Sequence, residues 1–288
     1  MNMPTMKKFL YSALLVVALP ILLQADPVEL PMTVAATGKI LVDLKVDGEP
    51  ITCIVDTGSP AFLLMDEAIA DKLHLEKKLI RTKLRFFAED VGVKTYRVKL
   101  DNIDVGPWHF ENVTALTIDD VRRTTGTGYR DLPNFISNGI LGMGFLQQFR
   151  VLLDYHRNRF VLTPPEHLTN PPFSLLAPIT EVSTGSGSRP FLLDTGSTFS
   201  VISSKALEPL GISYISLSGS DPLFKGMARA DKLQIGTLTM HDITLEVADH
   251  FEDYSGQSAI SGIIGYDLLK EMVLDFDFPR HTLTLEKP

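Results

Sequence analysis

Cysteine is nearly absent from this chain, and that absence excludes intrachain disulfides and cysteine-based metal sites. Cys53 is the only cysteine among 288 residues, so neither an intrachain disulfide nor a cysteine-rich metal site can form. Its neighbours in "ITCIVD" predict a buried strand residue rather than a nucleophile. The seven histidines show no metal-binding spacing such as His-Glu-x-x-His. We therefore expect no metal and no cofactor.

Runs of basic residues are also missing. The net charge is -8, which argues against a nucleic-acid partner. The composition, 44% hydrophobic and 22% charged, is typical of a soluble globular protein, and 18 prolines with 20 glycines indicate the many turns of a β-rich fold. The acidic stretch "DFDF" (residues 275–278) predicts a solvated strand face rather than a calcium site.

The N-terminal segment has the pattern of an export signal. Lys7 and Lys8 precede an apolar run at residues 9–23, and the small residue Ala25 follows as a cleavage site. An exported chain without disulfides suits a bacterial periplasm or secretion. The alternative is that the segment is retained and anchors the protein to the inner membrane. We expect residues 1–25 to form a signal peptide or this anchor.

The rest of the chain contains an internal repeat. Three segments of the first half return in the same order in the second half, which indicates two copies of one structural unit. The paired segments are "IVDTGSP" (54–60) with "LLDTGST" (192–198), residues 103–114 with 233–244, and residues 138–164 with 261–287.

The repeat predicts two lobes joined by a short connector. The N-terminal lobe is expected at residues 29–168 and the C-terminal lobe at residues 174–288, with the proline-rich residues 162–173 linking them. Each lobe is expected to be mostly β. Alternating apolar residues at 39–46 predict a half-buried strand, while the spacing at 65–75 predicts a helix.

Asp56 and Asp194 are the candidate catalytic residues. Each stands at the end of an apolar strand, where an ionised carboxylate needs hydrogen-bond donors or a charged partner. In a duplicated fold the two aspartates are related by a pseudo-twofold axis and can face each other. Two carboxyls at about 3 Å share one proton, so one acts as a base and the other as an acid. Such a pair can activate water and protonate a leaving amine.

The residues after each aspartate suit that task. A glycine permits a tight turn that aims backbone N–H groups at the carboxylate. A threonine hydroxyl can form hydrogen bonds across the interface, and a serine hydroxyl is expected to donate to the outer carboxyl oxygen. The supporting set is Thr57, Gly58, Ser59, Thr195, Gly196 and Ser197.

On these motifs the chain resembles the aspartic proteases of the pepsin and retropepsin superfamily, in the style of a bacterial single-chain member. Each lobe of that family carries a hydrophobic-hydrophobic-Asp-Thr-Gly-Ser loop and, later, a hydrophobic-hydrophobic-Gly segment, matched here by residues 140–142 and 263–265. The resemblance implies a mostly β, two-lobed pepsin-like fold. Each lobe would be a closed or partly open β-barrel-like unit with short helices, related by a pseudo-twofold axis. It also implies that Asp56 and Asp194 are the catalytic pair and that the threonines brace the lobes.

The implied function is that of an exported aspartic endopeptidase acting as a monomer on an extended peptide or protein. A water held by the two aspartates would hydrolyse the peptide bond without a metal or a nucleic acid, and the membrane would be a partner only if residues 1–25 are retained. One alternative is a catalytically silent peptide-binding protein with the same fold, although both aspartates and both glycines are intact. A narrow processing protease with little general activity is another.

The resemblance also implies a flap that closes over the substrate, in residues 81–97. Phe86 and Phe87 would contact the substrate from there, or would serve only in ordinary hairpin packing. The segment lacks the tyrosine followed by Gly-Thr-Gly that marks the pepsin flap, and the similar "TGTGY" occurs later, at residues 125–129. Pro60 stands where the family often has a small hydroxyl residue.

Overall fold

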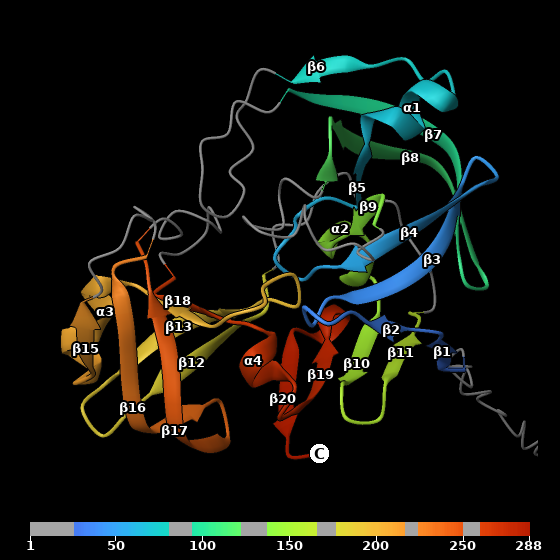
Figure 1. Ribbon diagram of the computed structural model, residues 1–288. Coiled ribbons are helices and arrows are strands. Elements are labelled where there is room, and N and C mark those ends of the chain that lie inside the picture. The colour runs from blue at the N-terminus through green and yellow to red at the C-terminus, as the bar shows by residue number, and fades with distance from the viewer. Residues whose placement is uncertain (1–25, 81–93, 122–136, 166–176, 217–223, 250–259) are drawn as a thin grey trace, which may run out of the picture.

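The computed structural model describes residues 26–80, 94–121, 137–165, 177–216, 224–249 and 260–288. Two strand-rich halves lie side by side, and the last strands of both halves meet between them (Figure 1). The fold is therefore mostly β and two-lobed, as the repeat predicts. Among the described residues, no helix is long and apolar enough to cross a membrane.

The first half is built around a closed barrel of six strands in the order β3-β4-β9-β5-β8-β7, which a second pairing of β3 with β7 closes. Short strands β2 and β6 extend its sheet. The bounds are β2 Thr33–Val34, β3 Ile40–Val46, β4 Glu49–Val55, β5 Leu63–Asp66, β6 Lys78–Ile80, β7 Thr95–Val105, β8 Trp108–Ile118 and β9 Gly139–Leu141, with helices α1 Glu67–Lys72 and α2 Met143–Leu146.

The second half repeats the strand order of this barrel. Its barrel has the order β12-β13-β18-β14-β17-β16 and closes through the pairing of β12 with β16, while β15 extends one edge. The bounds are β12 Ile179–Ser183, β13 Ser188–Leu193, β14 Val201–Ile202, β15 Ser213–Ser216, β16 Gly226–Ile235, β17 Leu238–Val247 and β18 Gly262–Ile264, with helices α3 Ser204–Leu210 and α4 Tyr266–Leu269.

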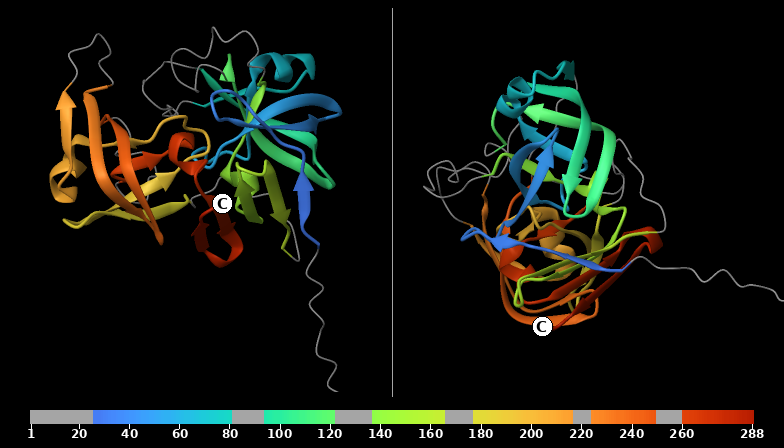
Figure 2. Two further views of the ribbon diagram at one scale, coloured as in Figure 1. Left: turned by 60° about the horizontal axis from the view of Figure 1, so that its bottom comes forward. Right: turned by 90° about the vertical axis from the view of Figure 1, so that its right-hand side faces the viewer.

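A third sheet joins the halves, in the order β1-β11-β10-β19-β20 (Figure 2). Its central pairing is antiparallel, between β10 of the first half and β19 of the second. The two halves therefore share backbone hydrogen bonds. The bounds are β1 Val28–Leu30, β10 Arg150–Asp154, β11 Arg159–Thr163, β19 Val273–Asp277 and β20 Thr282–Glu286, with the short 3-10 helix η3 at Phe278–Arg280.

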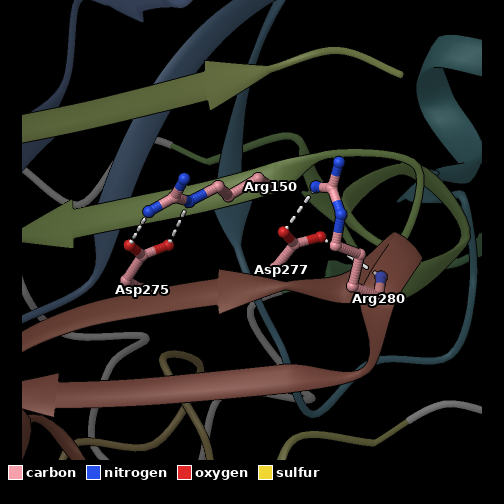
Figure 3. A network of polar contacts seen from close by, with 4 residues as sticks. All are labelled: Arg150, Asp275, Asp277 and Arg280. Carbon is pink, nitrogen blue, oxygen red and sulfur yellow. Dashed lines mark hydrogen bonds and ion pairs between the residues drawn. The ribbon is translucent and has the colours of Figure 1, made fainter. Parts of the chain in front are cut away.

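Ion pairs cross and border this shared sheet (Figure 3). Arg150 donates to both carboxylate oxygens of Asp275 at 2.9 and 2.6 Å, which links the halves, while Asp277 pairs with Arg280 at 2.7 Å. The two acids of "DFDF" thus have arginine partners. Among the described residues, no group of three or more His, Cys, Asp or Glu side chains is arranged to hold a metal ion.

The core follows from the strand patterns. In β3, Ile40 and every second residue after it are buried, as alternation predicts. Phe145 of α2 is fully buried among other aromatic rings, with centroids 5.7 Å from Phe62 and 4.9 Å from Phe149. This packing holds the segment after β9 against the barrel.

Two local predictions differ from the structure. The helix expected at residues 65–75 is shorter: Met65 and Asp66 end strand β5, and His74 has a positive φ of 55°, which an α-helix does not continue through. The connector expected at residues 162–173 begins inside β11, and its residues 166–173 lie outside the described residues.

Candidate active site

Asp56 and Asp194 occupy equivalent places, each directly after a central strand of its barrel. β4 pairs in parallel with β9, and β13 pairs in parallel with β18. The backbone N–H of Asp56 donates to the carbonyl of Leu141 at 3.0 Å, and that of Asp194 donates to the carbonyl of Ile264 at 2.9 Å. These hydrogen bonds make the chain turn at the same point in both barrels.

Backbone donors in the turns hold the carboxylates. The N–H groups of Gly58 and Ser59 donate to Asp56 Oδ1 at 2.7 and 3.0 Å. The N–H of Gly196 donates to Asp194 Oδ1 at 2.8 Å. A Cβ atom on Gly58 would lie 2.7 Å from Asp194 Oδ1, and one on Gly196 would lie 2.3 Å from Asp56 Cγ. Each glycine is therefore required because the carboxyl of the opposite lobe packs against it.

The two carboxyls lie close enough to interact with each other, since each packs against the glycine of the opposite turn. Asp194 is buried and Asp56 is partly exposed. Burial raises the pKa of Asp194 well above its usual range, and the adjacent charge of Asp56 raises it further. Burial also raises the pKa of Asp56, although the nearby Lys39 charge opposes that rise. The pair can therefore hold one proton and present an acid beside a base.

The threonines connect the two lobes reciprocally. Thr57 Oγ1 donates to the carbonyl of Leu193, and Thr195 Oγ1 donates to the carbonyl of Val55, both at 2.7 Å. Each hydroxyl also accepts from the backbone N–H of the other threonine, at 3.0 and 3.1 Å. Both side chains are buried. Four hydrogen bonds thus fix the distance between the two aspartate turns.

The hydroxyl of Ser197 does not point to the carboxylate as expected. Ser197 Oγ donates to the carbonyl of Phe199 at 2.9 Å, so its one proton is not directed at Asp194. Ser59 bonds to Asp56 through its backbone N–H. Backbone N–H groups of the turns thus support both carboxylates.

The hydrophobic-hydrophobic-Gly segments lie beside the aspartate turns. A Cβ atom on Gly142 would lie 2.5 Å from the carbonyl oxygen of Ser59, and one on Gly265 would lie 2.6 Å from the carbonyl oxygen of Phe199. The residue after Gly142, Met143, donates its N–H to the carbonyl of Ser59 at 2.7 Å. These glycines therefore allow a close backbone approach that fixes each turn.

Lys39 is a site residue that the strand pattern does not reveal. Alternation places it on the same side as Asp43 and Lys45, which are exposed, yet only 2% of Lys39 is exposed. Its Nζ donates to the carbonyl of Gly196 in the opposite lobe. Burial lowers the pKa of Lys39, while the charges of Asp194 and Asp56 act to raise it. The strand sequence gives no signal that Lys39 is buried, because the residues that cover it belong to the other lobe.

The two turns differ at their fourth residue after the aspartate. Thr198 Oγ1 donates to the carbonyl of Thr37 in the other lobe at 2.9 Å. Pro60, its counterpart, is exposed and has no hydroxyl. The expected flap residues Phe86 and Phe87, and the "TGTGY" stretch, lie outside the described residues.

Comparison with known proteins places this geometry in context. A family model described as "Aspartyl protease" matches residues 42–145 and 180–268, which is more than half of the chain. No curated protein matches. Among solved structures, aspartic proteinase from Irpex lacteus is 14% identical with a TM-score of 0.51, covering 91% of this chain and 97% of its own, which shows a shared fold. A retropepsin-like aspartic protease from Rickettsia conorii is 22% identical with a TM-score of 0.33, covering 48% of this chain and 91% of its own.

Thr57→Val is expected to destabilise the protein by about 2 kcal/mol or more, because it leaves the buried Leu193 carbonyl and the Thr195 N–H without their partner. The measurement is the free energy of unfolding in urea. Thr52→Val, in the strand β4 that leads to Asp56, is the matched control: it removes only an exposed hydrogen bond to Asp43 and should cost less than about 1 kcal/mol. Equal losses in the two variants would show that the reciprocal hydrogen bonds do not brace the lobes.

Proposed function

Because the chain belongs to the aspartyl protease family, we propose that it is an exported endopeptidase in which Asp56 and Asp194 act together on one water molecule. Peptidase activity follows from the family. The observation that supports the finer assignment is the close approach of two carboxyls that equivalent turns bring together across the lobes. No metal or cofactor is part of the proposed reaction.

The surroundings of the two carboxyls favour different roles for them. Asp56 Oδ1 receives two backbone N–H bonds, which favour the ionised form, whereas Asp194 Oδ1 receives one from Gly196. The pKa of Asp194 is also raised further above its usual range. In the free protein Asp194 therefore carries the shared proton, and Asp56 is the base.

The reaction then proceeds by water attack. Asp56 accepts a proton from the water as the water oxygen bonds to the scissile carbonyl carbon, and Asp194 donates its proton to the carbonyl oxygen. The proton on Asp56 next passes to the amide nitrogen, and the C–N bond breaks as the amine leaves. Collapse of the diol returns a proton to Asp194, so the pair ends with the one proton it began with. No covalent enzyme intermediate forms.

The proposed substrate is a peptide or protein segment in extended conformation. An extended chain offers N–H and C=O groups that can bond to backbone beside the two turns, as an added strand does. The chain would act as a monomer, since one copy already supplies both carboxyls. Phe86 and Phe87 remain the proposed substrate contacts of a flap.

Asp56→Asn and Asp194→Asn are each expected to reduce hydrolysis of a denatured protein by at least about 10²–10⁴-fold, because a single carboxyl cannot serve as both base and acid. Asp231→Asn is the matched control, an exposed aspartate in β16, and should retain wild-type turnover. Full activity in either site variant would refute the proposed roles. A statine-type mimic of the tetrahedral intermediate should block the wild type.

The raised pKa of Asp194 also predicts a pH effect on stability. Between the ordinary pKa near 4 and the raised value in the folded protein, the unfolded chain ionises Asp194 and the folded protein does not, so wild-type stability falls as pH rises. Asp194→Asn removes this loss. Its stability relative to the wild type should increase across that window by about 1.4 kcal/mol per pH unit traversed. Urea unfolding at several pH values measures the difference, which should stay constant for Asp231→Asn; a constant difference for Asp194→Asn would contradict the pKa assignment.

Export is supported by the basic, apolar and small-residue pattern of residues 1–25. Expression of the full chain in a bacterium should yield a soluble periplasmic or secreted protein whose N-terminus is Asp26, as measured by intact mass. Lys7→Glu with Lys8→Glu should slow this processing, because the basic flank is part of the signal. Recovery of the uncut chain in the membrane fraction would instead establish the anchor.

A further inference from the structure

Lys39 is a fully buried lysine beside the two carboxyls. Lysine is almost never fully buried unless its charge is paired, because removing an ammonium group from water is costly. Here 2% of the residue is exposed, and its Nζ donates to the carbonyl of Gly196, two residues after Asp194. A Cβ atom on Gly196 would lie 2.3 Å from Asp56 Cγ, so the same residue contacts both Lys39 and Asp56. The lysine is therefore part of the aspartate environment.

The backbone around Lys39 holds it in this place. The carbonyl of Lys39 accepts from the N–H of Ala35 at 2.9 Å, and the N–H of Gly38 donates to the carbonyl of Ala35 at 2.8 Å, which forms a turn. Gly38 has a φ of 81°, and a Cβ atom there would lie 2.0 Å from Cγ of Tyr266 in the second half. The turn is thus packed directly against α4 of the other lobe.

The equivalent position in the second half carries no charge. Leu41 pairs with Ile54, two residues before Asp56, and Ile179 pairs with Leu192, two residues before Asp194. Two residues before Leu41 is Lys39, and two before Ile179 is Ala177. The internal repeat therefore does not require a lysine here, and the single ammonium group breaks the symmetry of the site.

A count of charges suggests what the lysine does. Two carboxyls that share one proton carry a net charge of minus one, which is costly in a buried site. With the Lys39 ammonium group, the singly protonated pair is electrically neutral. Within the part of the chain that the structure describes, the neighbouring titratable groups are Tyr155, whose pKa is raised by burial and by the Asp194 charge, and Tyr266, whose ring lies 5.3 Å from that of Tyr155. The Nζ of the exposed Lys270 lies 5.8 Å from the centroid of the Tyr266 ring.

We propose that Lys39 is a positioning residue whose ammonium group neutralises the aspartate pair in its singly protonated state. The inference rests on the proposed function, since that protonation state is the one that acts on water. Lys39 acts through the carboxyls and does not itself transfer a proton. Its charge lowers the pKa of both carboxyls, so it sets the pH range over which one proton is shared.

The test is the pH dependence of kcat/KM for Lys39→Met, which removes the charge at similar volume, and Lys39→Gln, which keeps a hydrogen-bond donor for the Gly196 carbonyl. In both variants the acidic and the basic limbs of the kcat/KM profile should move to higher pH, by about one pH unit or more, because the charge that lowers the pKa of the carboxyls is gone. Lys39→Arg keeps the charge and should restore the wild-type limbs. Lys45→Met, an exposed lysine in β3, is the matched control and should leave the profile unchanged.

The outcomes separate this inference from the proposed function. Suppose that Asp56→Asn and Asp194→Asn are inactive, but that the neutral Lys39 variants have the same pH profile of kcat/KM as the wild type. Lys39 then has only a packing role, and the inference is wrong. If the aspartate variants stay active, the proposed function fails. In that case the pH dependence of thermal unfolding still tests Lys39. Without the ammonium charge the pKa of Asp194 should rise further, so the stability of the neutral variants should keep falling to higher pH than that of the wild type. An unchanged pH dependence overturns the inference. Should Lys39→Met not fold, Lys39→Gln carries the same test.

Discussion

The close approach of two carboxyls, one buried and one partly exposed, is the constraint on which the rest of the structure depends. Like-charged groups repel each other, and burial makes each charge costly. Three features of the fold offset this repulsion and this cost of burial. Backbone N–H groups of the turns donate to the carboxylates, and glycines let each carboxyl pack against the opposite lobe. The reciprocal hydrogen bonds of Thr57 and Thr195 hold the two turns together. Without such bracing, the two lobes would relax by moving the aspartates apart.

Duplication of one barrel creates the pair, and departures from symmetry give its members different surroundings. The strand orders of the two barrels are equivalent, and the shared sheet joins the last strands of each half. Asp56 nevertheless receives one more backbone hydrogen bond than Asp194. Thr198 reaches across to Thr37, whereas Pro60 cannot. A symmetric site would have no physical reason to assign the shared proton to one carboxyl.

Most of this architecture could be predicted from the sequence, because the repeated segments and the strand patterns are each visible in short stretches of residues. Alternation predicts β3, and the recurrence of Asp-Thr-Gly predicts the turns and the threonine contacts. The short form of α1 was not predictable from helical spacing alone, since strand pairing takes its first residues into β5. The joint sheet was also missed, because pairing of β10 with β19 is set by how the two halves dock.

Lys39 shows the same limit within the site. Its position in the strand pattern predicts exposure, and only contact with the opposite lobe makes it buried. Likewise, the serine hydroxyls were assigned to the carboxylates by residue type, but turn geometry directs Ser197 to the carbonyl of Phe199. Residue type and spacing identify which groups enter a site; they do not fix which partner each group meets.

The most direct measurement of the central claim is a crystal structure of the protein bound to a statine-type peptide. If Asp56 and Asp194 jointly hold the attacking water, the hydroxyl of the mimic should replace that water and lie within about 3.2 Å of both carboxyls. A mimic that binds away from the pair, or contacts only one carboxyl while the other points elsewhere, would contradict the account.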